Sequence, residues 1–480
     1  MGESVAFYDI SVWRSILLTG ILLGSLLLAH ILKCKGPLKN SLLPNAVLGG
    51  IIVLIVSTVL YYTTGNYLFN QTWLSADESG MNTLEILTYH CLAVGFIAMT
   101  LRDSDNSKVK GRLGEVIDSG LLTIGSYLVQ GITGVIITII AAVFISGFVP
   151  GSGMLLCFAF SQGTGQALTQ GANFDAAAGT GEVYANMGLA LAAAGFLIAS
   201  LGGVIILNIL KRRKIITVSK AEGYFSHDKS SEKEPGAEEM SSNEGVDRLS
   251  IQFSLIAVTY LLAYAMMFVL GKLISGMAGT IYGFNYLFGV IAAVIVKAVL
   301  KVLKKKGIVK KQYNNTFLLN RISGFAFDLM IVSGICAIQI HLLIDYVWVF
   351  VILVVIGTIV TFLYIWYVSK KIFPDVRYEQ FFGFFGMLTG TASTGVILLR
   401  EIDPRLESKA AENLVYQNIP AIILALPLLV VASMLYSSYE AAMNIPRAII
   451  IIASVAVYFI ILNIILFRKY IFKKKKVKVK

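Results

Sequence analysis

Residues 385–404 read FGMLTGTASTGVILLREIDP and lie between two long apolar runs. The first twelve of these residues include three glycines, three threonines and one serine. Neither a turn nor a soluble loop needs so many small polar groups. Non-helical backbone at membrane depth is tolerated where it lines a polar cavity or is buried in protein. The segment therefore predicts an irregular, buried piece of a membrane protein.

The composition of the whole chain agrees with this interpretation. Of 480 residues, 56% are hydrophobic and 14% are charged, and the mean hydropathy is +0.76. A soluble protein of this length needs more charge to cover its surface, which indicates a polytopic membrane protein. The net charge of +12 does not indicate a nucleic-acid partner, because the basic residues cluster at the ends of apolar runs.

Apolar runs of about 20 residues, the length that crosses hydrocarbon as a helix, recur along the chain. They predict an all-α polytopic membrane protein with about 11 transmembrane helices. The predicted spans are 12–32, 46–62, 83–101, 118–148, 183–210, 251–271, 284–300, 317–340, 345–369, 412–436 and 447–467.

Lysine and arginine predict the orientation of these spans. With the N-terminus outside, the segments that face the cytosol carry 36 of the 40 basic residues, and the outer stretches 63–82 and 149–182 carry none. Basic residues concentrate on the cytoplasmic side, so we expect the C-terminus in the cytosol. Attraction to anionic lipid headgroups explains the lysine-rich end, KKKKVKVK.

Cysteine and histidine give no sign of metal, disulfide or catalytic chemistry. The four cysteines have no CxxC spacing, and the four histidines form no HExxH motif. No phosphate-cradling glycine loop or nucleophile elbow occurs either. The sequence therefore predicts a protein that is not an enzyme and has no cofactor.

A polar segment at 215–249 divides the chain and is predicted to be a cytosolic linker. The first half is 1–214, with a glycine-rich hairpin predicted at about 150–172. The second half is 250–440, with a hairpin at about 376–400. Residues 441–480 add one more span and the basic tail.

The two halves share an order of features. Gly163-Thr164 corresponds to Gly390-Thr391, and Asp175 and Asp403 follow at 12 and 13 residues. Five predicted crossings precede the linker, so the second half begins on the opposite side of the membrane. Two related halves in inverted orientation are a design of secondary transporters. Small residues also occur where membrane helices pack closely, but two such segments in equivalent places favour paired re-entrant hairpins.

The sequence resembles the bacterial sodium/glutamate symporter family from the first span to about residue 436. The similarity is carried by FDLMIVSGICAI at 327–338, by GTASTGVILLREIDPRLES at 390–408 and by the layout of two halves and a linker. The first hairpin, SQGTGQA, departs from the GGHGT-like tip of that family, and the last span is additional. The resemblance implies sodium-driven uptake of glutamate by a homodimeric, elevator-type carrier in the bacterial cytoplasmic membrane.

Both hairpin tips and their neighbours are the candidate substrate site. Glycine permits sharp turns, carbonyls and hydroxyls replace an ion's hydration shell, and helix N-termini attract carboxylates. Amides at the starts of the next spans either bind the substrate or only cap a helix, and Arg400 either binds a carboxylate or anchors the inner side. The candidates are Gly163, Thr164, Gly165, Gln166, Asn186, Gly390, Thr391, Ser393, Thr394, Gly395, Arg400, Gln417 and Asn418.

Asp328, together with Thr391 and Ser393, is a candidate sodium ligand. It lies about ten residues into the eighth predicted span, and an intramembrane carboxylate is a functional candidate by default. The alternative is an ion pair with Arg321, seven residues earlier on the same helix face.

The function that these features favour is sodium-coupled symport of glutamate. A carrier of another small organic anion, such as a dicarboxylate, driven by sodium or protons, is the alternative; a channel or a scaffold is disfavoured.

Overall fold

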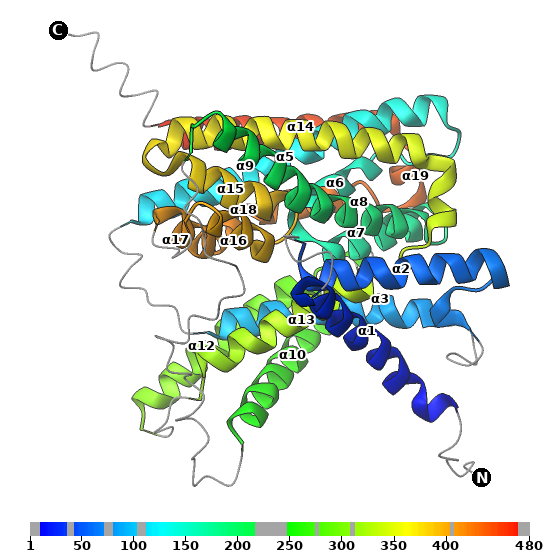
Figure 1. Cartoon of the computed structure of the whole chain (residues 1–480), viewed down its shortest axis with the longest axis horizontal. Helices are drawn as coiled ribbons and strands as arrows, with labels where there is room; N and C mark the ends of the chain where they lie inside the picture. The colour runs from blue at the N-terminus through cyan, green and yellow to red at the C-terminus, as the bar shows by residue number, and fades with distance from the viewer. Residues whose placement is uncertain are drawn as a thin grey trace. The chain divides into compact units, whose positions relative to one another are not determined.

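A computed structural model describes residues 10–35, 43–71, 80–102, 112–216, 247–273, 278–307, 313–403 and 408–468 (Figure 1). Within these ranges the chain is helical, and no β-strand occurs in them. Most of the predicted linker, 215–249, and the lysine-rich end fall outside the described residues.

Ten helices in the described part of the chain are long and apolar enough to cross a membrane. Two of them run through a change of helix type, a π-helical turn in one case and a 3₁₀ segment in the other. They are α1 (Ile10–Lys35), α2 (Asn45–Thr64), α3 (Gly80–Leu101), α5 (Leu113–Phe144), α8 (Val183–Leu197) with η3 (Ile198–Gly202) and α9 (Gly203–Arg212), α10 (Arg248–Leu273), α12 (Asn285–Lys305), α13 (Thr316–Cys336), η5 (Ile340–Tyr346) with α14 (Val347–Ile372), and α20 (Ile445–Leu466).

An eleventh candidate span is bent. Helix α17 (Lys409–Tyr416) and α18 (Asn418–Ser433) form a pair that turns by 46° at the junction. Pro420 explains the bend, because proline lacks an N–H and its ring crowds the carbonyl four residues earlier. The all-α fold and its membrane-length helices are thus confirmed, with eleven spans if the bent pair counts as one.

Short helices complete the described fold. They include both segments that were predicted to be hairpins. These helices are η1 (Leu68–Asn70), η2 (Ser152–Met154), α6 (Leu155–Gln162), α7 (Thr164–Ala178), α11 (Ala278–Gly283), η6 (Pro374–Val376), α15 (Arg377–Thr389), α16 (Ala392–Arg400) and α19 (Tyr439–Ala442).

Large apolar side chains remain exposed on the long helices. Phe144 is 82% exposed and Trp348 is 77% exposed. Apolar side chains on the outside of helices whose backbone groups are bonded internally are what a hydrocarbon solvent requires. The helix faces are consistent with a multi-pass membrane protein.

The chain folds into two compact units. Unit 1 comprises Met1–Tyr89, Asn106–Ser219 and Leu329–Lys480, and unit 2 comprises His90–Asp105 and Lys220–Asp328. Helices α3 and α13, the third long helix of each half, contribute residues to both units. The units therefore group elements by packing, whereas the two halves group them by order in the sequence.

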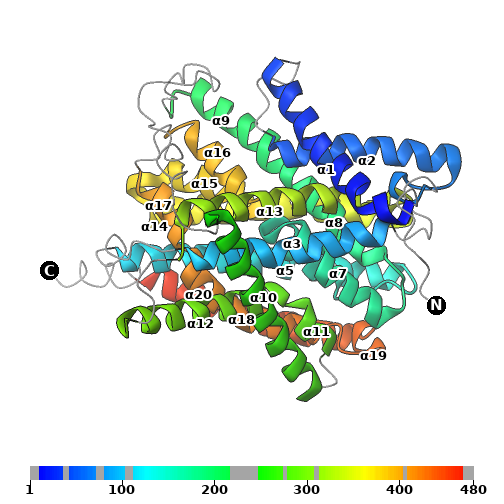
Figure 2. The same ribbon diagram turned by 90° about the horizontal axis from the view of Figure 1, so that it is seen from below.

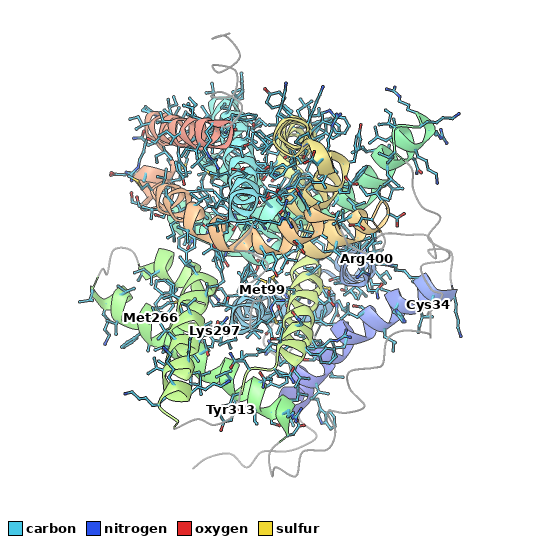
Figure 3. The ribbon with its side chains drawn as sticks, turned by 90° about the vertical axis from the view of Figure 1, so that its left-hand side faces the viewer. Cys34, Met99, Met266, Lys297, Tyr313 and Arg400 are labelled. Carbon is cyan, nitrogen blue, oxygen red and sulfur yellow. The ribbon has the colours of Figure 1, made fainter. Side chains whose placement is uncertain are left out.

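Unit 2 is built around the later part of α3. Its core contains apolar side chains of α3, α10, α12 and α13, namely Ile97, Ala98, Leu101, Ile256, Ala293, Leu319 and Ile322. Lys297 of α12 donates from Nζ to the carbonyl oxygens of Thr100 (3.1 Å) and Arg102. A cation is favourable at a helix C-terminus, and this contact explains why a lysine occurs inside an apolar span. Figure 3 labels Met99 of α3 and Lys297 of α12.

Unit 1 is organised around α5. Helices α14, α18 and α20 pack along it, as do η2 and α6 (Figures 1 and 2). The α5 positions Ser119, Thr123, Ser126, Gln130 and Thr138 are polar and buried. They recur at intervals of three to eight residues and therefore follow one side of the helix. A buried polar stripe at the centre of an apolar bundle marks where polar chemistry is possible.

Candidate functional site

The first predicted hairpin is a helix, a break at one glycine and a second helix. Gly163 ends α6 and begins α7, with φ 81° and ψ −173°. Backbone of this kind is essentially restricted to glycine. A residue with a side chain would continue or distort α6, so this glycine creates the break.

The N-terminus of α7 is buried and has no side-chain cap. Thr164 and Gln166 are each at most 1% exposed, and Gly163 supplies no cap. The Thr164 hydroxyl instead donates to the carbonyl oxygen of Met330 in α13 (3.2 Å). The first N–H groups of a helix lack partners within the helix, and they form a ready anion-binding site. The break therefore presents buried donors.

The second predicted hairpin is also a broken helix pair, with Gly390 between α15 and α16. Thr391 is the N-cap of α16, and its Oγ1 accepts a hydrogen bond from the Thr394 N–H (3.4 Å). The φ of Gly390 is −137°, and Gly395 lies inside α16. Unlike Gly163, neither glycine has a positive φ. Ser393 lies in the first turn of α16, and its side chain is outside the described residues.

The ends of the two breaks meet. The Ser161 hydroxyl lies 2.9 Å from the Leu388 carbonyl oxygen and 2.6 Å from Gln130 Oε1. Gln130 of α5 donates from Nε2 to the same Leu388 oxygen and to Thr361 Oγ1, each at 2.9 Å. Ser161 and Leu388 each stand two residues before a break glycine. Equivalent positions of the two segments are thus joined directly by the Ser161–Leu388 hydrogen bond, and also through Gln130 of α5.

Helix α8 and its π-helical continuation pass both breaks. The Cβ position of Gly195 is 2.3 Å from the Thr389 carbonyl oxygen, so only glycine fits. One residue on, the Phe196 ring lies 3.9 Å from the Cβ position of Gly163. Ala199, in η3, lies 3.1 Å from the Cβ position of Gly390. π-Helical turns are frequent at functional sites, and this one adjoins the second break.

Several buried polar groups around the breaks have no hydrogen-bond partner among the described residues. Both polar side-chain atoms of Gln166 are unpaired, as are the hydroxyls of Ser126 in α5 and Ser200 in η3. Native proteins rarely leave such groups unpaired, and each exception needs a water, an ion or a functional role as its explanation. These groups lie on α5, α7 and η3, the elements that adjoin the breaks, and each could bind a polar ligand.

Three predicted amides already have partners. Asn186 accepts from the Gln339 N–H (2.6 Å) and donates to the Glu182 carbonyl oxygen (2.8 Å). Gln417 accepts from the Thr123 hydroxyl (2.8 Å) and donates to Asn418 Oδ1 (2.9 Å). In this conformation these amides connect helices. Gly165 is buried in the first turn of α7, and Arg400 is exposed at the end of α16 (Figure 3).

Asp328 belongs to unit 2, whereas the breaks belong to unit 1. It stands near the middle of α13, and its side chain is exposed. The guanidinium of Arg321 lies over the Phe317 ring, 5.2 Å from its centroid. Among the described residues no ion pair joins Arg321 to Asp328. The structural alternative for Asp328 is therefore not observed.

The two acids after the breaks have the same local role. Asp175 accepts hydrogen bonds from the Tyr184 N–H (3.0 Å) and the Ala185 N–H (2.8 Å) at the start of α8. Asp403 accepts from the N–H of Ser408 (2.8 Å), the N-cap of α17. Each carboxylate stabilises the N-terminus of the following helix.

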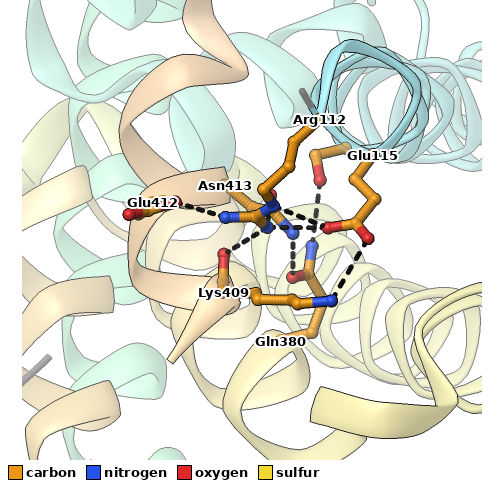
Figure 4. Close-up of polar contacts among 7 residues, drawn as sticks. Arg112, Glu115, Gln380, Lys409, Glu412 and Asn413 are labelled. Carbon is orange, nitrogen blue, oxygen red and sulfur yellow. Dashed lines mark hydrogen bonds and ion pairs between the residues drawn. The ribbon is translucent and has the colours of Figure 1, made fainter. Parts of the chain in front are cut away.

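A polar network links the start of α5 to α17 (Figure 4). The Arg112 guanidinium donates to Glu115, Glu412, the Lys409 carbonyl oxygen and Asn413. Asn413 also donates to Gln380 in α15 (3.2 Å). Because one side chain has partners on two helices, Arg112 is the centre of the network.

Arg112→Met is expected to lower the free energy of unfolding by about 1–3 kcal/mol, because its charged partners lose their hydrogen bonds. Lys409→Met is the matched control. Its Nζ lies 3.6 Å from Glu115 with the side chain 53% exposed, so we expect a change within about 0.5 kcal/mol. Thermal unfolding of the purified proteins in detergent measures both. Equal unfolding temperatures for the two variants would contradict the central role of Arg112.

The sequence interpretation missed polar residues of α5, α6 and η3. Gln130 and Ser161 join the breaks, and Ser126 and Ser200 carry unpaired hydroxyls. The spacing of serine, threonine and glutamine along the fourth span was a usable signal, because it repeats on one helix side. Ser200 has no comparable pattern around it.

Neither a family profile nor a curated protein matches the chain significantly.

Proposed function

We propose that this protein is a secondary active transporter that symports a small carboxylate-bearing anion with sodium, and that glutamate is its first candidate substrate. The observation that carries the proposal is the meeting of two broken helix pairs within one bundle of membrane-length helices. Breaks at membrane depth are found at transporter binding sites, and a scaffold has no use for them.

The first break supplies the carboxylate site. Buried N–H groups at the start of α7 and the unpaired Gln166 amide are neutral donors. They bind an anion by hydrogen bonding and by the helix dipole. Arg400 stands outside this set at the exposed end of α16, where it serves as an anchor on the inner side.

The second break supplies oxygen atoms for sodium. Thr391 and Thr394 hydroxyls lie 3.2 Å apart, and Ser393 belongs to the same turn. Ser200 adds an unpaired hydroxyl from η3, whose neighbour Ala199 adjoins Gly390. Rings of hydroxyl and carbonyl oxygens replace the hydration shell of such an ion. Asp328 contributes to coupling from unit 2, as a charge within a membrane span.

The element order supports two related halves. Each half has three long helices, a fourth long helix (α5 or α14), a broken pair and an acid that caps the next helix. Inverted halves of this kind move substrate by alternating access around a central site. The proposal includes an elevator-type movement, a homodimer and a bacterial cytoplasmic membrane with the N-terminus outside.

Counterflow in proteoliposomes tests the function. Liposomes loaded with unlabelled anion and supplied with labelled glutamate, aspartate, citrate or succinate should accumulate one label, and sodium should be required. Glutamate exchange that needs sodium supports the proposal in full. Sodium- or proton-dependent exchange of a dicarboxylate alone would replace the substrate, and the absence of coupled exchange for every anion would overturn the transporter assignment.

Asp328→Asn is expected to keep the protein folded and to raise the sodium concentration for half-maximal transport at least about threefold, because an amide does not replace the lost charge. Uptake at a series of sodium concentrations measures this. Arg321→Gln is the control, since its charge lies over an aromatic ring of the same helix. A sodium activation curve of Asp328→Asn that matches the parent would show that Asp328 has no part in coupling.

A further inference from the structure

Helix α7 carries a row of amides beyond the one at its N-terminus. Gln166, Gln170 and Asn173 are spaced by four and three residues, and such positions lie on one side of a helix. Gln166 is 1% exposed and Gln170 is fully buried. Both side-chain polar atoms of Gln166, Nε2 of Gln170 and Nδ2 of Asn173 are buried without a partner among the described residues. Four unpaired polar atoms on one helix side are too many for a packing surface.

The row is not the surface through which α7 packs against α8. The Cβ position of Gly171 lies 2.4 Å from the Tyr184 carbonyl oxygen, and that of Gly188 lies 2.6 Å from the Ala167 carbonyl oxygen. These neighbouring positions hold the two helices together through close backbone contact. Thr169 is also buried, but its hydroxyl is satisfied by the Gly165 carbonyl oxygen (2.8 Å). The amides at 166, 170 and 173 are thus dispensable for this contact.

Tyr436 sets the direction of the middle amide. Its hydroxyl donates to Gln170 Oε1 (2.7 Å), and its ring packs against Phe174, with centroids 5.0 Å apart. Because the oxygen of Gln170 is occupied, the amide offers only its NH₂ group. Three of the four unpaired atoms are therefore NH₂ donors, Gln166 Oε1 is the one unpaired acceptor, and the row carries no charge; this donor-rich set suits a carboxylate.

We propose that the amides of Gln166, Gln170 and Asn173 form a path along which the carboxylate of the transported anion reaches the first break. This inference rests on the proposed function. The stretch that contains α7 has no lysine or arginine from 149 to 182, so the path opens to the outer side. Neutral donors hold an anion weakly enough to pass it on, as conduction requires.

Gln170→Leu is the decisive variant. Replacing a buried amide whose NH₂ group is unpaired by an apolar side chain of similar size removes a desolvated donor. We therefore expect the unfolding temperature to stay equal to the parent or to rise, while uptake from outside falls at least tenfold with a raised KM. Tyr436→Phe is combined with Gln170→Leu, so that the Tyr436 hydroxyl is not left without the Gln170 oxygen that accepts its hydrogen bond. Thr169→Val is the matched control and should transport like the parent. Parental uptake by Gln170→Leu, or a fall in uptake equalled by Thr169→Val, would overturn the proposal.

A second measurement does not depend on transport. Asn173→Cys in the otherwise unchanged chain should react at least fivefold faster with an anionic methanethiosulfonate than with a cationic one of similar size, after subtraction of the parent's four cysteines. Leucine at Gln170 and Gln166 should abolish that preference. If the parent exchanges no anion but the preference is present, the proposed function fails and the path stands. A preference for the cationic reagent would overturn the path even in an active carrier.

Discussion

Gly163→Asn is expected to reduce transport at least about tenfold, whereas Gly179→Asn will leave it close to that of the parent. Gly163 has φ 81° and ψ −173°, a backbone conformation that costs other residues about 1–3 kcal/mol. Gly179 ends α7 with φ 68° and ψ 31°, the left-handed region that asparagine tolerates. A cost above about 1.4 kcal/mol corresponds to a factor of ten in rate or population.

Backbone conformation is the cause of this effect, because there is room for a side chain at Gly163. The nearest atoms to its Cβ position are Met330 Cε at 3.8 Å and Phe196 Cζ at 3.9 Å. Alanine and asparagine should therefore be similarly harmful there. Initial uptake rates, normalised to the amount of inserted protein, provide the comparison. Equal uptake by Gly163→Asn and Gly179→Asn would mean that the break does not need this geometry.

Gly395→Ala is expected to destabilise the second broken pair by about 3 kcal/mol, the upper end of the usual cost of overpacking. A Cβ at this position would lie 2.3 Å from the Gly383 carbonyl oxygen and 3.1 Å from the Met387 N atom. Both are backbone atoms, so α15 and α16 would have to move apart. We expect a lower unfolding temperature and loss of transport.

Gly383→Ala is the control on the facing helix. Its Cβ would meet nothing closer than 3.8 Å, and alanine favours a helix over glycine by about 1 kcal/mol. The unfolding temperature of this variant should equal or exceed that of the parent. A stable, active Gly395→Ala protein would show that the two helices separate easily, and that their close contact is not needed for the site.

Local patterns predicted most of the long helices correctly. Gly163 and Gly390 stand at the predicted tips, and each adjoins the end of a helix. Helix α5 begins at Leu113, five residues before the predicted span, because Glu115 and Asp118 lower hydropathy without opposing helix formation. The sequence interpretation did not predict the bend in the tenth span, although a proline inside a span, Pro420, favours a bend there.

Side-chain partners could not be predicted in the same way. Asn186 and Gln417 were candidates for either substrate binding or helix capping, and the structure pairs them with Gln339 and Thr123. An amide bonds to any suitable group that the fold brings near, and these partners come from segments remote in the sequence. Asp328 and the tips share a predicted site, but they belong to different compact units.

By itself, the sequence determined the all-helical membrane fold and the approximate positions of the long helices, because hydropathy depends on neighbouring residues. Only the tertiary structure decided that Ser161 and Gln130 meet the Leu388 carbonyl oxygen, and that the α7 amides are left without partners. These contacts depend on how the helices pack. Packing brings together residues that are far apart in the sequence, and the sequence around each of them does not indicate its partner.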